Sequence, residues 1–350
     1  MLRRLVEVNS FTGNRDGVEQ VARMVEEMFC PLGFRARRIG DHLALERGGA
    51  GGPRLLLIGH LDTVYPENFP WREADGRIFG PGVCDMKGGI VVMWMALLEF
   101  CPDVTLLFNA AEEGGCADFP PLARSLVTPA TRACFVYEPG LEEGGKTTVV
   151  TERKGSGRFR VEVTGRQAHS GHSHGKGASA IRELARVVER IEAATDYANG
   201  VTFNVGTIEG GTTVNSVPGR ASASLDLRAW TPGDFARGRA LALGLAGEGS
   251  VPGTRVAVTE RPGYPPWPAN EGSGALGKLA CSLDPGLVAG RRGGGSDGCH
   301  LWDLVPTLDG LGPVGRNAHV ATGPDPESVD GASFGPRAKL SAALFRKLLA

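Results

Sequence analysis

The stretch RLLLIGHLDT, residues 54–63, decides the fold class, because a short apolar run ends abruptly in polar residues. The run at 54–58 is too short for a helix and apolar enough to be a buried strand. Two similar runs follow, VTLLF at 104–108 and ACFVY at 133–137, with helical stretches between the runs. This alternation predicts an α/β fold built on a mostly parallel sheet with both faces buried.

Polar side chains follow each predicted strand directly. His60 and Asp62 come after the first strand, Glu112 and Glu113 after the second, and Glu138 after the third. In an open parallel sheet, sites form in the crevice beyond the carboxyl ends of the strands. We therefore expect these side chains to meet at one edge of the sheet.

Asp85 is expected to join them from the glycine-rich loop at 80–89. Carboxylates that share a site raise one another's pKa unless cations neutralise them, and mixed imidazole and carboxylate ligands suit zinc. An alternative stays open, because one H-x-D after a strand is usually structural and adjacent glutamates usually form a solvated loop. The recurrence of polar residues at three strand ends favours the metal site.

In the region from 158 to 260 the predicted order of elements changes to strand, helix, strand, strand, helix, strand. This order predicts a ferredoxin-like α+β domain. Its first strand alternates, with Phe159, Val161 and Val163 on the apolar face. We expect this domain, 154–262, to be inserted between two parts of a catalytic domain, 1–153 and 263–350. It is the expected lid or dimerisation domain.

Composition narrows the class of partner. The formal net charge is -1, from 38 basic and 39 acidic residues, which gives no one-signed field for nucleic acid or an acidic membrane surface. We expect a small molecule or short peptide as substrate. The seven cysteines are scattered without a C-x-x-C pair, and residues 1–13 contain no apolar signal segment, so we expect a cytoplasmic location.

The chain resembles the dizinc metallopeptidase family that includes glutamate carboxypeptidase, acetylornithine deacetylase and succinyl-diaminopimelate desuccinylase. The resemblance is collinear and covers nearly the whole chain. It rests on GHLDTVYP (59–66), GPGVCDMKGG (80–89), NAAEEGG (109–115), YEPG (137–140), RQAHSG (166–171), GGTTVNSVP (210–218), DLRAW (226–230), GGGSDG (293–298) and LDGLGPVGRNAHV (308–320).

The resemblance implies a role for each residue of the cluster. Asp85 would bridge two Zn²⁺ ions, with Co²⁺ or Mn²⁺ as alternatives. The remaining ligands would be His60 and Glu138 on one ion and Glu113 and His319 on the other. The resemblance also assigns Asp62 to orient His60, and Glu112 as the general base that moves a proton to the leaving nitrogen.

The resemblance further implies that His169 reaches the active site of a partner subunit and stabilises the oxyanion there, which requires a homodimer. Two neighbours depart from the family pattern: Ser170 stands where alanine is usual and His174 where proline is usual. The alternative for His169 is an ordinary loop histidine.

The substrate's carboxylate or carbonyl would be held by Asn215 and Arg228, by the same resemblance. Arginine suits this bidentate task, although an ion pair between Arg228 and Asp226 is the alternative. Further residues that we expect to grip a terminal carboxylate are Arg261 and, through backbone donors, the loop residues Gly294, Gly295 and Ser296.

Three functions are compatible with these residues. The family's carboxypeptidase, deacetylase and desuccinylase branches carry glutamate at the position of Glu138, which favours a carboxypeptidase that releases a C-terminal amino acid, glutamate above others. The first alternative is an N-acyl amino acid deacylase of the acetylornithine deacetylase type. The second is a metal-binding scaffold without catalysis, which the presence of Glu112 argues against.

Overall fold

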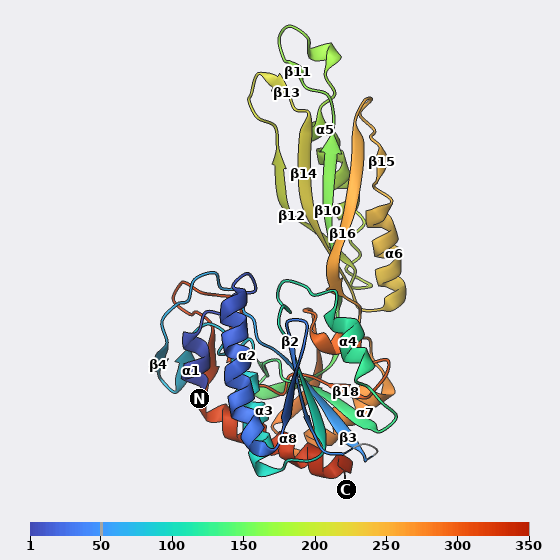
Figure 1. The fold of residues 1–350 in the computed structure, drawn as a ribbon. Coiled ribbons are helices and arrows are strands. Elements are labelled where there is room, and N and C mark those ends of the chain that lie inside the picture. The colour runs from blue at the N-terminus through green and yellow to red at the C-terminus, as the bar shows by residue number, and fades with distance from the viewer. Residues whose placement is uncertain (50–51, 350) are drawn as a thin grey trace. The chain divides into compact units, whose positions relative to one another are not determined.

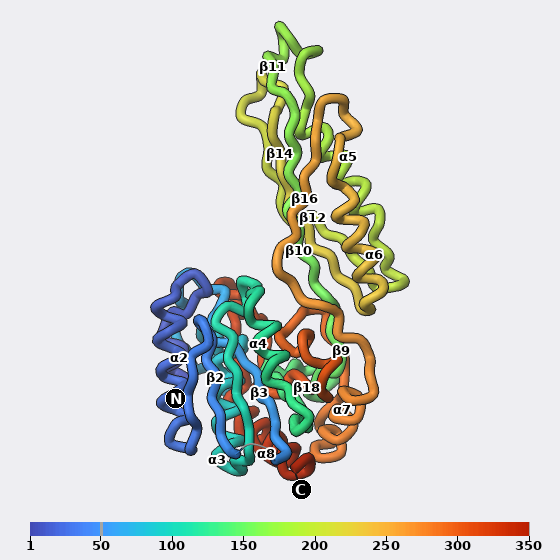
Figure 2. Tube along the Cα trace, turned by 45° about the vertical axis from the view of Figure 1, so that its right-hand side comes forward, coloured from blue at the N-terminus to red at the C-terminus, as the bar shows by residue number. Residues whose placement is uncertain are grey.

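The computed structural model describes residues 1–49 and 52–349, and the chain divides into two compact units. Unit 1 comprises Met1–Glu152, Ala269–Arg292 and Ser296–Ala350, and unit 2 comprises Arg153–Pro268 and Gly293–Gly295. The two ends of the chain both belong to unit 1, where segments far apart in sequence lie side by side (Figures 1 and 2).

Unit 1 is built on a six-stranded sheet of order β1-β2-β6-β3-β7-β18. Strand β3 runs parallel to both β6 and β7, as the sequence predicted. The short strand β18, which was not predicted, runs parallel to β7, and β1 and β2 add an antiparallel hairpin next to β6. The strands are β1 (Arg35–Ile39), β2 (His42–Arg47), β3 (Arg54–His60), β6 (Val104–Asn109), β7 (Thr131–Val136) and β18 (Thr307–Leu308).

Both faces of this sheet are buried. Alternate residues of β3 point to opposite faces, so Leu55 and Leu57 join one core cluster while Leu56 and Ile58 join another. The larger cluster lies under α2, α3 and α8, and the smaller one under α4. The helices of unit 1 are α1 (Leu2–Glu7), α2 (Arg15–Phe29), α3 (Lys87–Glu99), α4 (Phe119–Ser125), α7 (Glu271–Leu283) and α8 (Phe334–Leu349).

Two glycines at the start of α3 allow close backbone packing, Gly89 against the end of β7 and Gly88 against the loop that precedes the helix. A Cβ atom on Gly89 would lie 2.1 Å from the carbonyl oxygen of Tyr137, and one on Gly88 would lie 2.2 Å from that of Val83. Helix α3 begins just after Asp85, and Tyr137 just precedes Glu138. The absence of side chains at Gly88 and Gly89 therefore brings the Asp85 loop next to the end of β7.

Two smaller sheets complete unit 1. Their orders are β17-β9-β8 and β19-β20-β5-β4. Their strands are β4 (Arg72–Ala74), β5 (Arg77–Phe79), β8 (Glu142–Glu143), β9 (Lys146–Arg153), β17 (Leu287–Arg292), β19 (Gly315–Arg316) and β20 (Ser328–Asp330).

Unit 2 has the predicted element order and an antiparallel sheet of order β12-β14-β10-β16-β15. The predicted apolar face of β10, Phe159, Val161 and Val163, packs in its core. The elements are β10 (Gly155–Thr164), β11 (Ala168–His169), α5 (Ala180–Glu192), β12 (Thr202–Gly210), β13 (Ser216–Val217), β14 (Arg220–Ala229), α6 (Pro232–Leu243), β15 (Gly247–Glu248) and β16 (Arg255–Tyr264).

Two further observations concern the chain as a whole. All seven cysteines are free thiols. Within residues 1–49 and 52–349, no helix has both the length and the apolar character needed to cross a membrane.

Candidate metal centre

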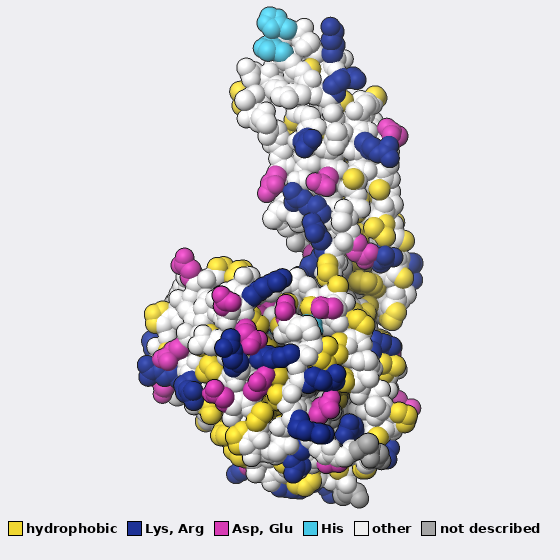
Figure 3. Space-filling model, in the orientation of Figure 1, with side chains coloured by type: hydrophobic (Ala, Val, Ile, Leu, Met, Phe, Trp, Pro, Cys, Tyr) yellow, Lys and Arg dark blue, Asp and Glu magenta, His cyan; other side chains and the backbone are white. Residues whose placement is uncertain are grey.

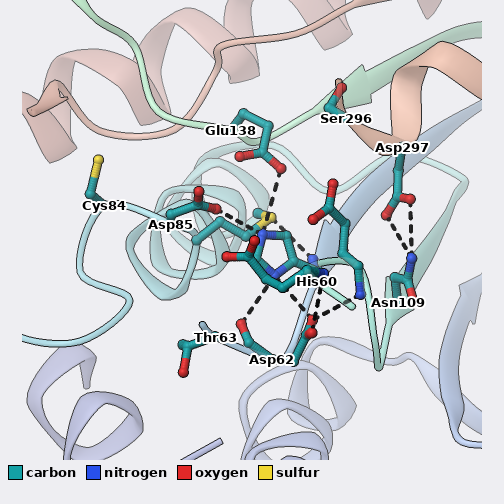
Figure 4. A network of polar contacts seen from close by, with 12 residues as sticks. His60, Asp62, Thr63, Cys84, Asp85, Asn109, Glu138, Ser296 and Asp297 are labelled. Atoms are coloured by element: carbon teal, nitrogen blue, oxygen red, sulfur yellow. Dashed lines mark hydrogen bonds and ion pairs between the residues drawn. The ribbon is translucent and has the colours of Figure 1, made fainter. Parts of the chain in front are cut away.

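The polar residues that follow β3 and β7 converge with Asp85 at the carboxyl edge of the central sheet (Figure 4). The imidazole Nε2 of His60 lies 2.8 Å from Asp85 Oδ1 and 3.6 Å from Glu138 Oε1. All three side chains are largely buried. His60, Asp85 and Glu138 therefore form one half of a compact centre.

The other half is formed around the second oxygen of Asp85. His319 Nε2 lies 3.2 Å from Asp85 Oδ2 and also 3.2 Å from Glu113 Oε1. Asp85 thus stands between the two histidines and offers one carboxylate oxygen to each. The structure brings together all five residues expected as ligands, in the two groups that the family resemblance implied.

Asp62 forms hydrogen bonds with the loop that carries Glu112 and Glu113. Its Oδ1 accepts a hydrogen bond from the backbone N–H of Glu112 at 3.0 Å, and its Oδ2 accepts from the N–H of Glu113 at 3.2 Å and the Thr12 hydroxyl at 2.6 Å. The Nδ1 of His60 is nearer to the carbonyl oxygen of Asp62, at 3.1 Å, than to its Oδ1, at 3.4 Å. A proton on Nδ1 leaves Nε2 as the ligand atom.

The electrostatics of the centre are those of crowded, buried acids. Burial raises the pKa of Glu138 well above its ordinary value, and the charge of Asp85 raises it further. Burial also raises the pKa of Glu112, although His60 partly opposes this shift. Burial alone would raise the pKa of Asp85, but its hydrogen bonds with His319 and His60 lower it.

The donor set fits a divalent metal ion. Glu113 Oε1 is buried, and although His319 Nε2 lies 3.2 Å away, no residue that the structure describes donates to this oxygen with hydrogen-bond geometry. Ligand atoms of His60, Asp85 and Glu113 all lie within 4.8 Å of one another. A cation among these atoms would satisfy Glu113 and offset the repulsion between carboxylates, and imidazole with carboxylate is a ligand set suited to zinc.

A second group of suitable side chains is His42, Cys116 and Asp118, whose ligand atoms also lie within 4.8 Å of one another. Here His42 Nδ1 accepts the N–H of Ala110 at 3.2 Å, so the proton of the neutral ring sits on Nε2, which faces Asp118. The Cys116 thiol donates to Asp118 at 2.7 Å, and burial raises its pKa to about 12. This group is better described as a hydrogen-bonded cluster.

Sequence reasoning missed two buried acids near the centre. Both oxygens of Asp297 accept from the Asn109 side-chain amide, at 3.1 and 3.2 Å, and burial raises the Asp297 pKa to about 7. Glu327 accepts hydrogen bonds from the N–H groups of Cys84 and Asp85, and burial raises its pKa to about 7. Neither acid follows a predicted strand; only the GGGSDG motif around Asp297 offered a signal.

In unit 2, His169 pairs with Ser216 in the short β11–β13 ladder, and the N–H of Ser170 donates to the carbonyl oxygen of Asn215. Histidine side chains gather on the surface at the end of unit 2 that carries this ladder (Figure 3). His169 Nδ1 accepts the N–H groups of Gly171 and His172 at 3.0 and 3.1 Å. The neutral ring therefore carries its proton on Nε2, which makes that atom a donor.

The residues predicted to bind a carboxylate lie in different surroundings. Arg228 Nε forms the ion pair with Asp226 Oδ1, at 2.7 Å, so this alternative is realised, and Arg261 is exposed on β16. The carbonyl oxygens of Gly294 and Gly295 accept from Arg153. Ser296 belongs to unit 1, where its buried hydroxyl donates to Asp309 at 2.7 Å.

Residues 151–242 match the family model for the peptidase dimerisation domain of M20 peptidases. The chain is 28% identical to carboxypeptidase G2 from Pseudomonas sp. strain RS-16, over 91% of this chain and 82% of that protein. It is 29% identical to succinyl-diaminopimelate desuccinylase from Acidiphilium cryptum, over 91% of each.

Solved structures share the fold. A tripeptidase from Staphylococcus aureus superposes with a TM-score of 0.80 at 21% identity, covering 99% of this chain and 96% of that one. An M20 family metallo-carboxypeptidase from Sulfolobus solfataricus superposes with a TM-score of 0.74 at 17% identity, covering 99% and 98%. The α/β fold with an inserted dimerisation domain is therefore confirmed.

Proposed function

We propose a reaction for this chain on the premise that it belongs to the M20 metallopeptidase family and is a metal-dependent hydrolase of amide bonds. The proposed reaction releases a C-terminal amino acid, glutamate above others, from an acyl or peptidyl substrate. The observation that carries the proposal is the position of Asp85 between His60 and His319, with Glu138 and Glu113 completing the two halves.

Two Zn²⁺ ions would be held by His60 with Glu138 and by Glu113 with His319, and Asp85 would contribute one carboxylate oxygen to each pair. When bound, the ions supply Lewis-acid activation of the water and of the scissile carbonyl.

Glu112 is proposed to take the proton of the attacking water and to deliver it to the leaving nitrogen. Its raised pKa suits a group that must both accept and donate a proton. Asp62 fixes the backbone of this loop through the N–H groups of Glu112 and Glu113.

His169 is proposed to donate its Nε2 proton to the developing oxyanion in a partner subunit. Within unit 2, strand β14 begins at Arg220, just after the β13 segment that lies next to Asn215. Arg228 is eight residues further along the strand, which corresponds to about 26 Å. The chain enters and leaves unit 2 near the Arg228 end, which pairs with Ser156. His169 and Asn215 therefore lie at the end of the unit 2 sheet that is opposite to its chain connections.

The proposed homodimer forms through the inserted domain, for which we keep the boundaries 154–262 between catalytic parts 1–153 and 263–350. Strand β12 is an edge of the sheet, and all five of its residues from Gly206 to Gly210 are exposed, including Ile208. An exposed strand edge is a template for pairing with another chain. The match of residues 151–242 to a dimerisation domain supports the same assembly.

The substrate's carboxylate is proposed to bind Arg228 and Arg261, together with backbone N–H groups of the Gly294–Ser296 segment, and Asn215, which lies at the opposite end of unit 2, is proposed to contribute from a partner subunit. Arginine gives the bidentate geometry that a carboxylate needs. The free thiols support a cytoplasmic location for the enzyme.

A panel of N-acylated amino acids, assayed with Zn²⁺ restored, tests the proposal. We expect glutamate conjugates to be cleaved, and metal analysis to find two equivalents of zinc per chain. The matched variant Glu112→Gln should keep the metal and lose about two or more orders of magnitude in rate. An unchanged rate in this variant would refute the mechanism, and no metal after reconstitution would refute the site.

The second reaction considered is N-acyl amino acid deacylation, which the identity to succinyl-diaminopimelate desuccinylases supports. It uses the same centre and differs only in the group that the pocket accepts. Rapid cleavage of acetylornithine with no turnover of glutamate conjugates would establish this alternative. Stoichiometric metal binding without hydrolysis of any substrate would instead indicate a non-catalytic scaffold.

A further inference from the structure

We propose that Glu327 is a positioning residue for the metal centre, which fixes the Asp85 loop and the His319 loop relative to each other. This inference rests on the proposed function, because it assumes that Asp85 and His319 bind metal. Glu327 follows His319 by eight residues, 327 minus 319, and none of the sequence motifs includes it.

The first link is to the Asp85 loop. Glu327 is fully buried, and its Oε1 accepts the backbone N–H groups of Cys84 at 2.8 Å and Asp85 at 3.1 Å. Its Oε2 accepts the hydroxyl of Tyr65 at 2.5 Å. The carboxylate of Glu327 therefore holds the backbone of the residue proposed to bridge the metals, and Tyr65 holds the carboxylate.

The second link is to the His319 loop. The backbone N–H of Glu327 donates to the carbonyl oxygen of Val320 at 2.8 Å, next to His319. Asn317 and His319 have φ values of 56° and 70°, a left-handed conformation that costs free energy for residues other than glycine. The surrounding contacts must hold that conformation, and the hydrogen bond from Glu327 to Val320 is one of them.

A purely structural role explains these contacts less well. Burying a carboxylate is costly, and an apolar or amide side chain of similar size usually gives equal or greater stability. A charge here adds negative potential beneath Asp85, which favours a divalent cation and disfavours the metal-free protein. The arrangement thus suits a residue that contributes to metal binding rather than to stability alone.

The test uses the full-length protein and measures Zn²⁺ affinity by competition with a chromophoric chelator. Glu327→Gln keeps an acceptor for the two N–H groups and removes the charge, whereas Tyr65→Phe keeps the charge and removes its orienting hydrogen bond. Groups that orient metal ligands typically change affinity about 10-fold to 100-fold, and we expect losses in this range for both variants. The exposed carboxylate variant Glu67→Gln, which also removes one negative charge, should bind like wild type.

The melting temperature of the metal-free protein separates positioning from stability. We expect Glu327→Gln to melt no lower than wild type without metal, because the variant no longer buries a carboxylate. A lower melting temperature with unchanged affinity would overturn the inference. So would an effect of Glu327→Gln without one of Tyr65→Phe, since charge alone would then suffice. Failure of the wild-type protein to bind Zn²⁺ would instead refute the proposed function.

Discussion

Asp62 contacts both His60 and the backbone of the loop that carries Glu112 and Glu113. The resemblance implied only that it orients His60. The structure adds that the same carboxylate receives the N–H groups of Glu112 and Glu113, the proposed base and a proposed ligand. Because Asp62 is fully buried, each of these donors depends on it, and the geometry of the base is tied to the geometry of the metal centre.

Replacing Asp62 with asparagine should therefore damage stability and catalysis together. The amide nitrogen would face at least one backbone N–H, and an unsatisfied buried donor costs about 1–3 kcal/mol. We expect urea denaturation to show a loss in that range and kcat/KM to fall about 10-fold to 100-fold. Thr12→Val removes only the hydroxyl donor and should have the smaller effect; equal effects would contradict this account.

His300 gives a pH dependence that is separate from the metal centre. Burial, and then the charge of Arg124, lower its pKa from 6.5 to about 4. The unfolded chain therefore binds the proton more readily, so this contribution to stability is complete above pH 6.5 and declines as the pH falls toward 4.

Between pH 7.5 and pH 5, the wild-type protein should lose about 1–2 kcal/mol more unfolding free energy than His300→Gln, at roughly 1.4 kcal/mol per pKa unit. Urea titrations at the two pH values measure the difference. The other titrating groups are common to both proteins and cancel. Parallel pH dependence in the two proteins would show that His300 is protonated equally in the folded and unfolded states.

At the scale of secondary-structure elements, most of the fold could be predicted from the local pattern of apolar residues. The apolar runs before His60, Glu112 and Glu138 formed parallel neighbouring strands, because burial on both faces requires continuous apolar sequence. The sequence analysis did not predict the hairpin β1–β2. Nor did it predict the small sheet in which β20 pairs with β5, because these two strands are distant in the chain. The 3₁₀ turn Asp297–His300 was likewise not predicted.

The candidate site divides in the same way. Ligands that follow strands could be predicted because a strand's end fixes their place. Glu327 and Asp297 could not, because their importance lies in contacts with Asp85 and Asn109, which only the tertiary fold brings close. For Arg228, the position in a strand could be predicted from the sequence. The ion pair with Asp226 could not, because it depends on the rotamer of the side chain.

The close packing at Gly88 and Gly89 of α3 leads to a prediction about substitutions in this helix. Gly89→Ala would place a methyl group 2.1 Å from the Tyr137 carbonyl oxygen, so the helix or the end of β7 must move. We expect a destabilisation of about 1–3 kcal/mol, the usual range for overpacking, and weaker Zn²⁺ binding through displacement of Asp85 and Glu138. Thermal denaturation and metal titration measure the two effects.

Gly274 in α7 is the matched control, because it also lies in the first turns of a helix but a Cβ there meets nothing within 4 Å. Gly274→Ala should stabilise the protein by up to about 1 kcal/mol through helix propensity and unfolded-state entropy. Destabilisation of both variants to the same extent would mean that close packing against Tyr137 is not the cause.

At the scale of the molecule, the proposed transfer of His169 between subunits can be tested by mixing two inactive variants. Glu112→Gln lacks the base and His169→Ala lacks the oxyanion donor, so each homodimer should be nearly inactive. After subunit exchange, activity should return to about a quarter of wild type, because half of the randomly assorted dimers each hold one intact site.

If His169 served the active site of its own chain, no mixed dimer would contain an intact site and mixing would restore nothing. Mixing Glu112→Gln with Asp85→Asn provides the control. Both substitutions lie in unit 1 and affect the same centre, so each mixed dimer still lacks a complete site. Activity from that control pair would indicate residual function in one variant.

The chain passes between the two units four times, at 152/153, 268/269, 292/293 and 295/296, because Gly293–Gly295 is grouped with the inserted unit. Chimaeras that exchange only residues 153–268 would combine the sheet of another protein with this chain's own Gly293–Gly295 segment. The carbonyl oxygens of that segment accept hydrogen bonds from Arg153 and Arg228. Recombination between relatives should therefore succeed best when both segments are inherited together, as two linked breakpoint pairs.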